Sequence, residues 1–207
     1  MLAFDLEQDC GAEDGRVVLG VDEAGRGPLA GPVVAAAVWL CPDKVRSGLF
    51  SEIRDSKVLP AERRRDLLAL LQGEARIAVG IAESPEIDEI NILQASLLAM
   101  RRAVDGLGLG AAQALVDGNV PPKLDCPVRT VVGGDALCLS IAAASIVAKE
   151  TRDALMDELA ETFPGYGWES NRGYGTRQHQ EAIRRLGVTP QHRRSFRPIR
   201  EALGLSL

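Results

Sequence analysis

Short apolar runs alternate with longer segments of helical periodicity along this chain, and that order places it in the α/β class. Strands are expected at the apolar runs, which cover residues 17–21, 32–40, 75–82, 112–116 and 128–132. Helices are expected at residues 60–72, 84–104, 137–161 and 178–186, with another near the C-terminus. The sequence therefore predicts a mixed sheet flanked by helices.

Two of the expected helices carry boundary signals. Pro60 stands in the first turn of one helix, and Gly73 stands just past its end. Ser84 is the expected cap of the next helix, with Pro85 at the first helical position. Apolar residues then repeat with helical spacing, which predicts one buried stripe. Its members are Ile90, Leu93, Leu97, Met100 and Val104.

Composition excludes several classes of protein. The four cysteines form no CxxC pair, and together with only two histidines they give neither zinc-site spacing nor a disulfide framework. Residues 1–16 are predicted to be a polar, frayed tail without the residue order of a signal peptide. The most apolar later stretch, residues 136–148, is shorter than the roughly 20 residues that a membrane span needs. We therefore expect no membrane partner and a reducing, cytoplasmic location.

Carboxylates stand where three of the apolar strands stop. Asp22 and Glu23 follow the first strand, Asp117 follows the fourth, and Asp135 follows the fifth. Ligands gather at strand ends in α/β sheets, and four converging carboxylates would repel one another without a cation. Oxygen ligands without histidine or cysteine favour Mg²⁺ or Mn²⁺ over zinc. Structural alternatives stay open, since Asp135 could cap a helix and Asp117 could start a turn.

The glycine-rich segment GRGPLAG, from Gly25 to Gly31, directly follows the first strand. A dinucleotide-binding loop should open a helix, whereas this one is followed by a predicted strand and has the spacing GxGxxxG. We therefore expect Gly25, Arg26 and Gly27 to let a ligand approach the backbone closely, because glycine has no side chain to obstruct it. A tight turn between strands is the structural alternative.

Positive charge is concentrated near the C-terminus of a chain whose formal net charge is −5. Eight arginines occur between residues 172 and 200 against a single acid: Arg172, Arg177, Arg184, Arg185, Arg193, Arg194, Arg197 and Arg200. Tyr166, Trp168 and Tyr174 lie among glycines in the same region. Phosphate contacts and ring stacking make this segment a candidate nucleic-acid face, although a solvated arginine-rich helix is the plain alternative.

Taken together, these segments resemble the bacterial ribonuclease HII family. The resemblance is carried in order by GVDEAGRGPLAGPVVAAAV, DSKVL, INILQASLLAM, VDGN, GGD followed by IAAASIVAKETRD, FPGYGW, GYGT and HRRSF. These motifs extend from about Gly20 to Arg197, which is nearly the whole chain.

The resemblance implies a ribonuclease H-like fold with a five-stranded mixed sheet and a small helical C-terminal lobe. Residues 1–16 would be the tail, 17–163 the catalytic core and 164–207 the lobe. The metal-binding catalytic carboxylates would be Asp22, Glu23, Asp117 and Asp135, the same four residues that the strand ends indicate. Two ions, Mg²⁺ or Mn²⁺, would accompany bound substrate, one activating water and the other stabilising the leaving oxygen.

The substrates implied by the resemblance are RNA/DNA hybrids and duplex DNA that contains single ribonucleotides, cut on the 5′ side. The backbone of Gly25, Arg26 and Gly27 would contact the ribonucleotide 2′-OH. Tyr174 would stack on the next deoxyribose. Lys57, Ser145 and Arg172 are further expected substrate contacts, with Arg172 replacing a lysine common in the family.

Nothing in the sequence demands more than a monomer, and no docking tail for a replication clamp is evident. Two rival functions stay open: a non-catalytic nucleic-acid-binding module and a dinucleotide-dependent oxidoreductase. The first leaves the four carboxylates without a role, and the second lacks the helix that should follow Gly31.

Overall fold

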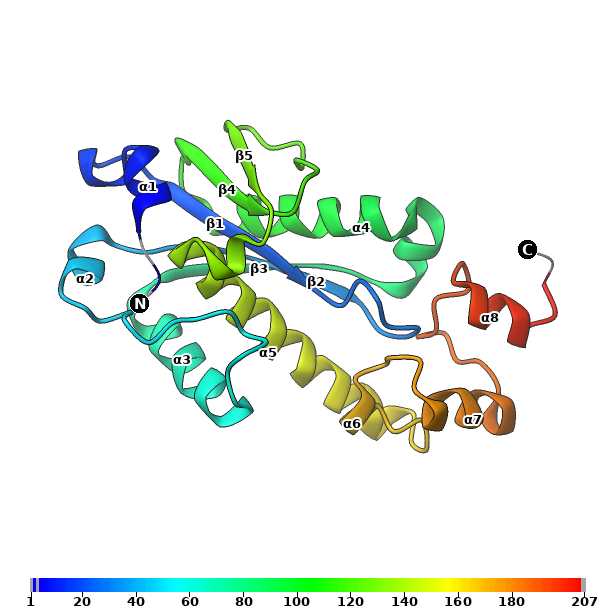
Figure 1. Cartoon of the computed structure of the whole chain (residues 1–207). Helices are drawn as coiled ribbons and strands as arrows, with labels where there is room; N and C mark the ends of the chain where they lie inside the picture. Colours follow the sequence, from blue (N-terminus) through cyan, green and yellow to red (C-terminus); the bar gives the residue numbers. More distant parts are fainter. Residues whose placement is uncertain (1, 3, 206–207) are drawn as a thin grey trace.

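The computed structural model describes residue 2 and residues 4–205 of the chain. A single five-stranded sheet lies at its centre in the order β3-β2-β1-β4-β5 (Figure 1). Its strands are β1 (Val18–Ala24), β2 (Val33–Trp39), β3 (Arg76–Ala82), β4 (Gln113–Asp117) and β5 (Val128–Val131). The first three strands pair antiparallel, whereas β4 and β5 run parallel to β1. The prediction of a mixed sheet is confirmed.

Alternate residues of β2 contact two different helical layers. Ala36 and Val38 belong to the apolar cluster that includes α3 (Ala61–Glu74) and α5 (Leu139–Thr162). Ala35 and Ala37 belong to the cluster that includes α4 (Ser84–Leu107). Because successive side chains of a strand point to opposite faces, the sheet is covered on both sides.

Glycine allows both long helices to lie directly against the sheet. A Cβ placed on Gly20 in β1 would stand 2.1 Å from the backbone carbon of Ser140 in α5. A Cβ on Gly80 in β3 would stand 2.1 Å from the backbone oxygen of Ala99 in α4. The alanine-rich α5 therefore approaches β1 at backbone distance, as its small residues lead one to expect.

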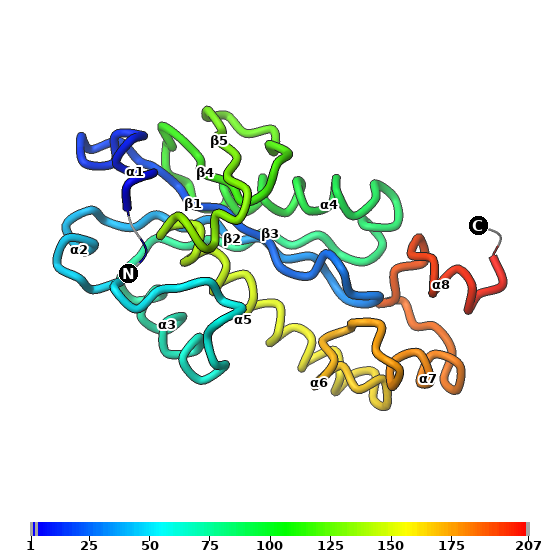
Figure 2. Tube along the Cα trace, viewed as in Figure 1, coloured from blue at the N-terminus to red at the C-terminus, as the bar shows by residue number. Residues whose placement is uncertain are grey.

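Four shorter helices complete the main fold. They are α2 (Pro42–Arg46), α6 (Trp168–Asn171), α7 (Arg177–Leu186) and α8 (Arg197–Ala202). The last three lie around the C-terminal end of α5, with α6 beside it (Figure 2). Their buried side chains form one cluster with Leu29, Ala30 and Met156. The sequence predicted α7 and a C-terminal helix, and it missed α2 and α6.

The N-terminal segment is not a frayed tail as predicted. It forms helix α1 (Asp5–Asp9) and a 3-10 turn, η1 (Ala12–Asp14). Glu7 of α1 is fully buried, and its Oε1 accepts the backbone N–H of Ser140 at 2.7 Å. This bond satisfies a free N–H in the first turn of α5, whose capping residue Cys138 supplies no side-chain bond.

Several predicted helix details are wrong. Gly73 lies inside α3, which ends at Glu74. Glu83, rather than Ser84, caps α4 through a reciprocal bond with Glu86. Asn91 interrupts α4 with φ 65°, and this break changes which residues face the sheet.

Beyond the break, small residues form the buried face of α4. Ala95, Ala99, Met100 and Ala103 are buried, whereas Ile90, Leu93, Leu97 and Val104 are only half-buried. The predicted stripe is therefore confirmed in part, since Met100 is buried and Ile90, Leu97 and Val104 pack against the same apolar cluster, whereas Leu93 does not belong to it. Across the residues that the structure describes, none of the helices has the length and apolar character to cross a membrane.

Candidate active site

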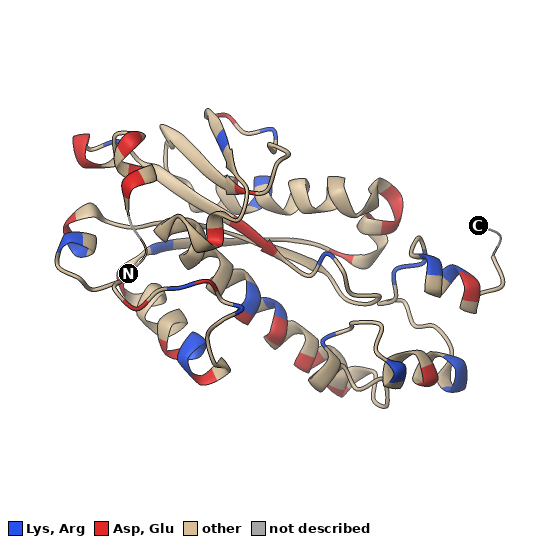
Figure 3. Ribbon diagram, in the orientation of Figure 1, with Lys and Arg blue, Asp and Glu red and all other residues tan. Residues whose placement is uncertain are grey.

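Four carboxylates meet where β1 and β4 lie side by side. The two strands are parallel neighbours, with Val21 opposite Val116, so Asp22 and Asp117 follow as adjacent residues. Glu23 comes next on β1, and Asp135 lies in the 3-10 turn η2 (Gly134–Ala136) that leads into α5. Figure 3 shows the acidic segments of β1 and η2 close together beside the end of β4.

Asp22 and Glu23 lie within β1 rather than beyond its end. The strand continues to Ala24, and these two residues pair with Ala36 and Ala35 of β2. The sequence placed the strand end at Val21 because the polar residues interrupt the apolar run. The backbone pairing fixes both carboxylates more firmly than a loop would.

Burial and mutual repulsion set the charge behaviour of the site. Asp22 is 5% exposed, and burial raises the pKa of its carboxyl well above the ordinary value. The charges of Glu23, Asp117 and Asp135 raise that pKa further. Burial also raises the pKa of Glu23, against the opposing charge of Arg26. The interactions of Asp22 with all three other carboxylates show that the four groups form one electrostatic unit.

Each carboxylate has a neighbouring donor on one oxygen. Asp22 Oδ1 accepts the N–H of Glu23 at 2.7 Å, and Asp117 Oδ1 accepts the N–H of Gly134 at 2.7 Å. Lys57 Nζ donates to Asp135 Oδ2 at 2.5 Å, and Asp135 raises the pKa of that lysine. Glu23 Oε1 accepts from Arg26 at 3.3 Å, but its Oε2 is buried with no hydrogen-bond partner.

The chemistry of this donor set suits a hard divalent cation. Carboxylate oxygens are the preferred ligands of Mg²⁺ and Mn²⁺, and the unpartnered Oε2 of Glu23 is a buried acceptor available to one. In the arrangement described, no three His, Cys, Asp or Glu side chains among the described residues are grouped tightly enough to hold one ion. Side-chain movement, including release of Asp135 from Lys57, would have to accompany binding.

The glycine loop and Tyr174 lie next to each other. A Cβ placed on Gly27 would stand 3.5 Å from Cε1 of Tyr174. Leu29 N–H donates to the carbonyl of Gly173 at 2.8 Å, which joins the two segments through their backbones. Tyr174 is 50% exposed, so its ring is available to a ligand. Arg26 is also exposed at the surface of this loop.

Two buried arginines hold the backbone of the glycine loop, a role that the sequence pattern did not reveal. Arg152 of α5 donates to the carbonyls of Pro32, Ala30 and Arg172. Arg193 donates to the carbonyls of Gly25, Arg26, Gly31 and Pro32.

Burial is nearly complete for both guanidinium groups, at 2% exposure for Arg152 and 0% for Arg193. Burial lowers the pKa of Arg152 to about 10 and that of Arg193 to about 9, and the charge of Arg152 contributes to the latter shift. Both side chains are charged at neutral pH. Two buried positive charges therefore lie beneath the loop that the sequence assigns to substrate binding.

Part of the predicted nucleic-acid face is wrong. Arg193 cannot touch a surface ligand, because it is fully buried. Tyr166 and Trp168, at 5% and 0% exposure, pack against each other with ring centroids 5.1 Å apart. Of the three clustered aromatics, Tyr174 alone presents its ring to solvent.

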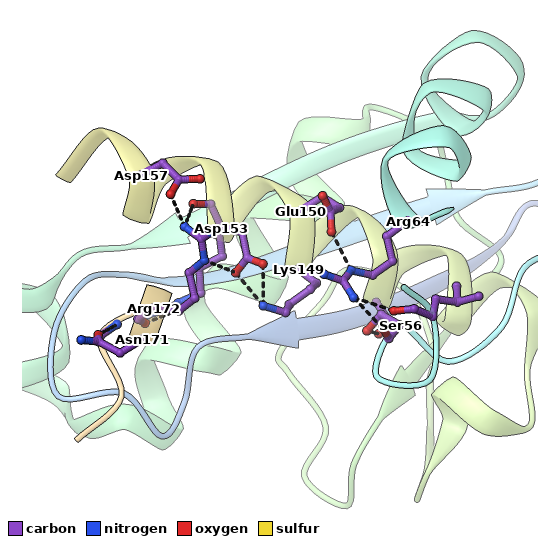
Figure 4. Close-up of polar contacts among 12 residues, drawn as sticks. Ser56, Arg64, Lys149, Glu150, Asp153, Asp157, Asn171 and Arg172 are labelled. Atoms are coloured by element: carbon purple, nitrogen blue, oxygen red, sulfur yellow. Dashed lines mark hydrogen bonds and ion pairs between the residues drawn. The ribbon is translucent and has the colours of Figure 1, made fainter. Parts of the chain in front are cut away.

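The three remaining predicted contacts occupy different environments. Lys57 is largely exposed at its pair with Asp135. Ser145 is 5% exposed, and its hydroxyl bonds to that of Ser56 at 2.6 Å. Arg172 pairs with Asp157 and approaches Asp153 at 3.9 Å (Figure 4). A direct substrate contact through Ser145 or Arg172 requires these internal bonds to change.

A mixed sheet covered on both faces, with four carboxylates where β1 and β4 lie side by side, is the arrangement expected of a metal-dependent nuclease of the ribonuclease H class. The comparisons with known proteins narrow that class. The family model for Ribonuclease HII matches residues 19–199, and this chain belongs to that family of hydrolytic endoribonucleases.

Relatives and solved structures agree with the family model. The Ribonuclease HII of Paramagnetospirillum magneticum is 58% identical over 187 residues, covering 90% of this chain and 93% of the relative. The crystal structure of the ribonuclease H2 from Pyrococcus horikoshii matches with TM-score 0.75 and 27% identity, covering 89% of this chain and 96% of that one. The crystal structure of Bst-RNase HIII in complex with Mn²⁺ matches with TM-score 0.76, covering 91% of this chain and 70% of that one. Its sequence identity is 18%, so this match shows a shared fold alone.

Proposed function

We propose that this protein hydrolyses the RNA strand of RNA/DNA hybrids and incises duplex DNA on the 5′ side of single embedded ribonucleotides. The products would carry 3′-hydroxyl and 5′-phosphate ends. The observation that carries the proposal is the convergence of Asp22, Glu23, Asp117 and Asp135 beside the exposed Tyr174 and the glycine loop. Family membership supports the same reaction. The activity serves ribonucleotide and primer removal.

We propose Asp22, Glu23, Asp117 and Asp135 as the residues that hold Mg²⁺ or Mn²⁺, with two ions present when substrate is bound. The cations would supply water activation and leaving-group stabilisation for in-line phosphodiester hydrolysis. Support comes from the raised pKa of Asp22, caused by burial and by the neighbouring carboxylates, because a bound cation would offset that repulsion. The buried, unpartnered Oε2 of Glu23 points to the same need.

Lys57 would exchange its carboxylate partner for the substrate backbone. Its ammonium pairs with Asp135 Oδ2, although its own side chain is 75% exposed. The flexible lysine can leave Asp135 and contact the phosphate backbone of an incoming substrate. That exchange would release a carboxylate oxygen when nucleic acid arrives.

The recognition of a single ribonucleotide is assigned to the glycine loop and Tyr174. The backbone of Gly25, Arg26 and Gly27 would read the 2′-OH, and the Tyr174 ring would stack on the following deoxyribose. Their proximity supports joint reading of an RNA–DNA junction. Ser145 and Arg172 would contribute from their positions on and beside α5, after breaking the bonds that now hold them.

The surrounding duplex would be gripped by the exposed arginines of the C-terminal lobe. Arg177, Arg184, Arg185, Arg194 and Arg197 are exposed at this surface. Arg177 and Arg197 are paired with Glu181 and Glu201, which reduces their net contribution. We propose a monomer built from a core at residues 17–163 and a lobe at 164–207. We assign it to the cytoplasm, where its four free cysteines suit a reducing environment.

The test is cleavage of a DNA duplex that carries one ribonucleotide, with and without Mg²⁺ or Mn²⁺, with the cut mapped to the nucleotide. Metal-dependent incision on the 5′ side is the expected result. Cleavage confined to long RNA tracts would retain the carboxylates but refute the assigned roles of the glycine loop and Tyr174. Folded protein that binds both duplexes and cuts neither would instead be a nucleic-acid-binding module.

A further inference from the structure

Both histidines of the chain lie in a buried cluster directly behind Tyr174. His179 of α7 is 0% exposed and His192 is 1% exposed. Trp168, also at 0% exposure, packs against both imidazole rings. The two histidines are far from the carboxylates in the chain, and the proposed hydrolysis gives them no role.

Two groups that can only donate hydrogen bonds determine which imidazole nitrogens of this cluster carry protons. The backbone N–H of Thr189 can only donate, and it lies 3.0 Å from His192 Nδ1, so that nitrogen is the acceptor. His192 therefore carries its proton on Nε2 and donates to His179 Nε2 at 3.1 Å. The indole N–H of Trp168, which also can only donate, points to the same His179 Nε2 at 3.0 Å.

The last hydrogen bond of this series is made to the backbone of Tyr174. Because His179 Nε2 accepts two donors, its proton lies on Nδ1, which donates to the Tyr174 carbonyl at 2.9 Å. That carbonyl also accepts the N–H of Thr176 at 2.8 Å, and the Tyr174 N–H donates to the Asn171 carbonyl at 2.9 Å. The half-exposed ring therefore depends on a backbone held from within the lobe.

We propose that His179, oriented by His192 and Trp168, is a positioning residue that aims Tyr174 at the substrate. The proposal rests on the proposed function, because Tyr174 is the assigned junction reader. Both imidazoles are neutral in this arrangement, and burial lowers the pKa of each, with His192 brought to about 4. Neutrality preserves the direction of every bond, since a second proton on His192 would face the Thr189 N–H.

Two substitutions at position 179 separate positioning from mere packing. In His179→Asn the side-chain NH₂ takes the place of Nδ1 and can still donate to the Tyr174 carbonyl. In His179→Gln the amide reaches the place of Nε2, and the bond to Tyr174 is lost. The readout is the ratio of kcat/KM on a duplex with one ribonucleotide to kcat/KM on a hybrid with a long RNA tract.

We expect His179→Gln to lower this ratio roughly tenfold, which is the effect of losing one hydrogen bond. His179→Asn should leave the ratio close to the wild-type value. His179→Gln should change nothing further in a Tyr174→Ala background, because both changes act through one ring. Equal ratios in the two single variants, or an additive loss in the double variant, would overturn the proposal. Melting temperatures of all variants establish that each protein is folded.

An independent readout requires no activity. The ¹⁵N chemical shifts of the wild-type imidazoles at neutral pH should show Nδ1–H for His179 and Nε2–H for His192. The opposite tautomers, or a charged ring, would refute the bonding scheme even in an active enzyme. Wild-type protein that cuts neither substrate would overturn the proposed function, while the tautomer result would stand or fall separately.

Discussion

Gly25→Ala should be severely destabilising, because the added methyl group would collide with the buried side chain of Arg152. Its φ is +97°, and an added Cβ would lie 2.0 Å from Nε and 2.4 Å from Cδ of Arg152. Arg152 is buried and cannot move aside without losing bonds to three carbonyls. Each hydrogen bond from a charged donor is worth about 1.5–3 kcal/mol. Displacement of the guanidinium therefore costs about 3 kcal/mol or more.

The matched control is Gly48→Ala, since Gly48 has φ +82° and no neighbouring atom within 4 Å of an added Cβ. Backbone strain there costs about 1–2 kcal/mol, partly offset by lower entropy of the unfolded chain. Urea unfolding at pH 7, followed by tryptophan fluorescence, should give Gly25→Ala a free energy of unfolding about 3 kcal/mol below that of Gly48→Ala. Equal losses in the two variants would refute the assigned position of Arg152.

Three further predictions follow from single contacts. Since the pKa of His192 falls from 6.5 to about 4 on folding, its contribution to stability is complete above pH 6.5 and is lost as pH falls toward 4. The free energy of unfolding of wild type should drop over that range by about 3 kcal/mol more than that of His192→Gln, and parallel profiles would contradict this. Glu7→Ala should cost about 1–2 kcal/mol in urea unfolding, because it removes the acceptor for Ser140 N–H; a loss no larger than that of the exposed Gln8→Ala would count against the capping role. Lys57→Met should tighten Mn²⁺ binding several-fold in calorimetry without nucleic acid, because the ammonium no longer competes for Asp135 Oδ2; unchanged or weaker binding would argue against that competition.

The sheet and the carboxylates could be predicted because short-range pattern determines them. Each of the five runs predicted as strands is a strand, and the acids at 22, 23, 117 and 135 lie close together because β1 and β4 are parallel neighbours that carry them toward the same edge of the sheet. The break at Asn91 was harder to anticipate. Asparagine tolerates positive φ, but the apolar repeat continues through it and gives no warning.

The support of the glycine loop could be predicted only in part. Arg152 lies on the same face of α5 as Ile141, Ser145, Ala148 and Met156, so its spacing marks it as a buried cation. Arg193 carries no such signal, because its neighbour Arg194 is exposed and only the tertiary contacts distinguish them. For the same reason composition could not separate buried Tyr166 and Trp168 from exposed Tyr174.

The most direct test of the catalytic carboxylates compares Asp22→Asn with wild type in single-turnover incision at one embedded ribonucleotide, in saturating Mn²⁺. The control is Asp105→Asn, an exposed change at the far end of α4. We predict that Asp105→Asn cuts at the wild-type rate, whereas Asp22→Asn stays folded, melts no lower than wild type without metal, and makes no detectable cut. Incision by Asp22→Asn at the wild-type rate would contradict the assignment of this carboxylate cluster as the catalytic centre.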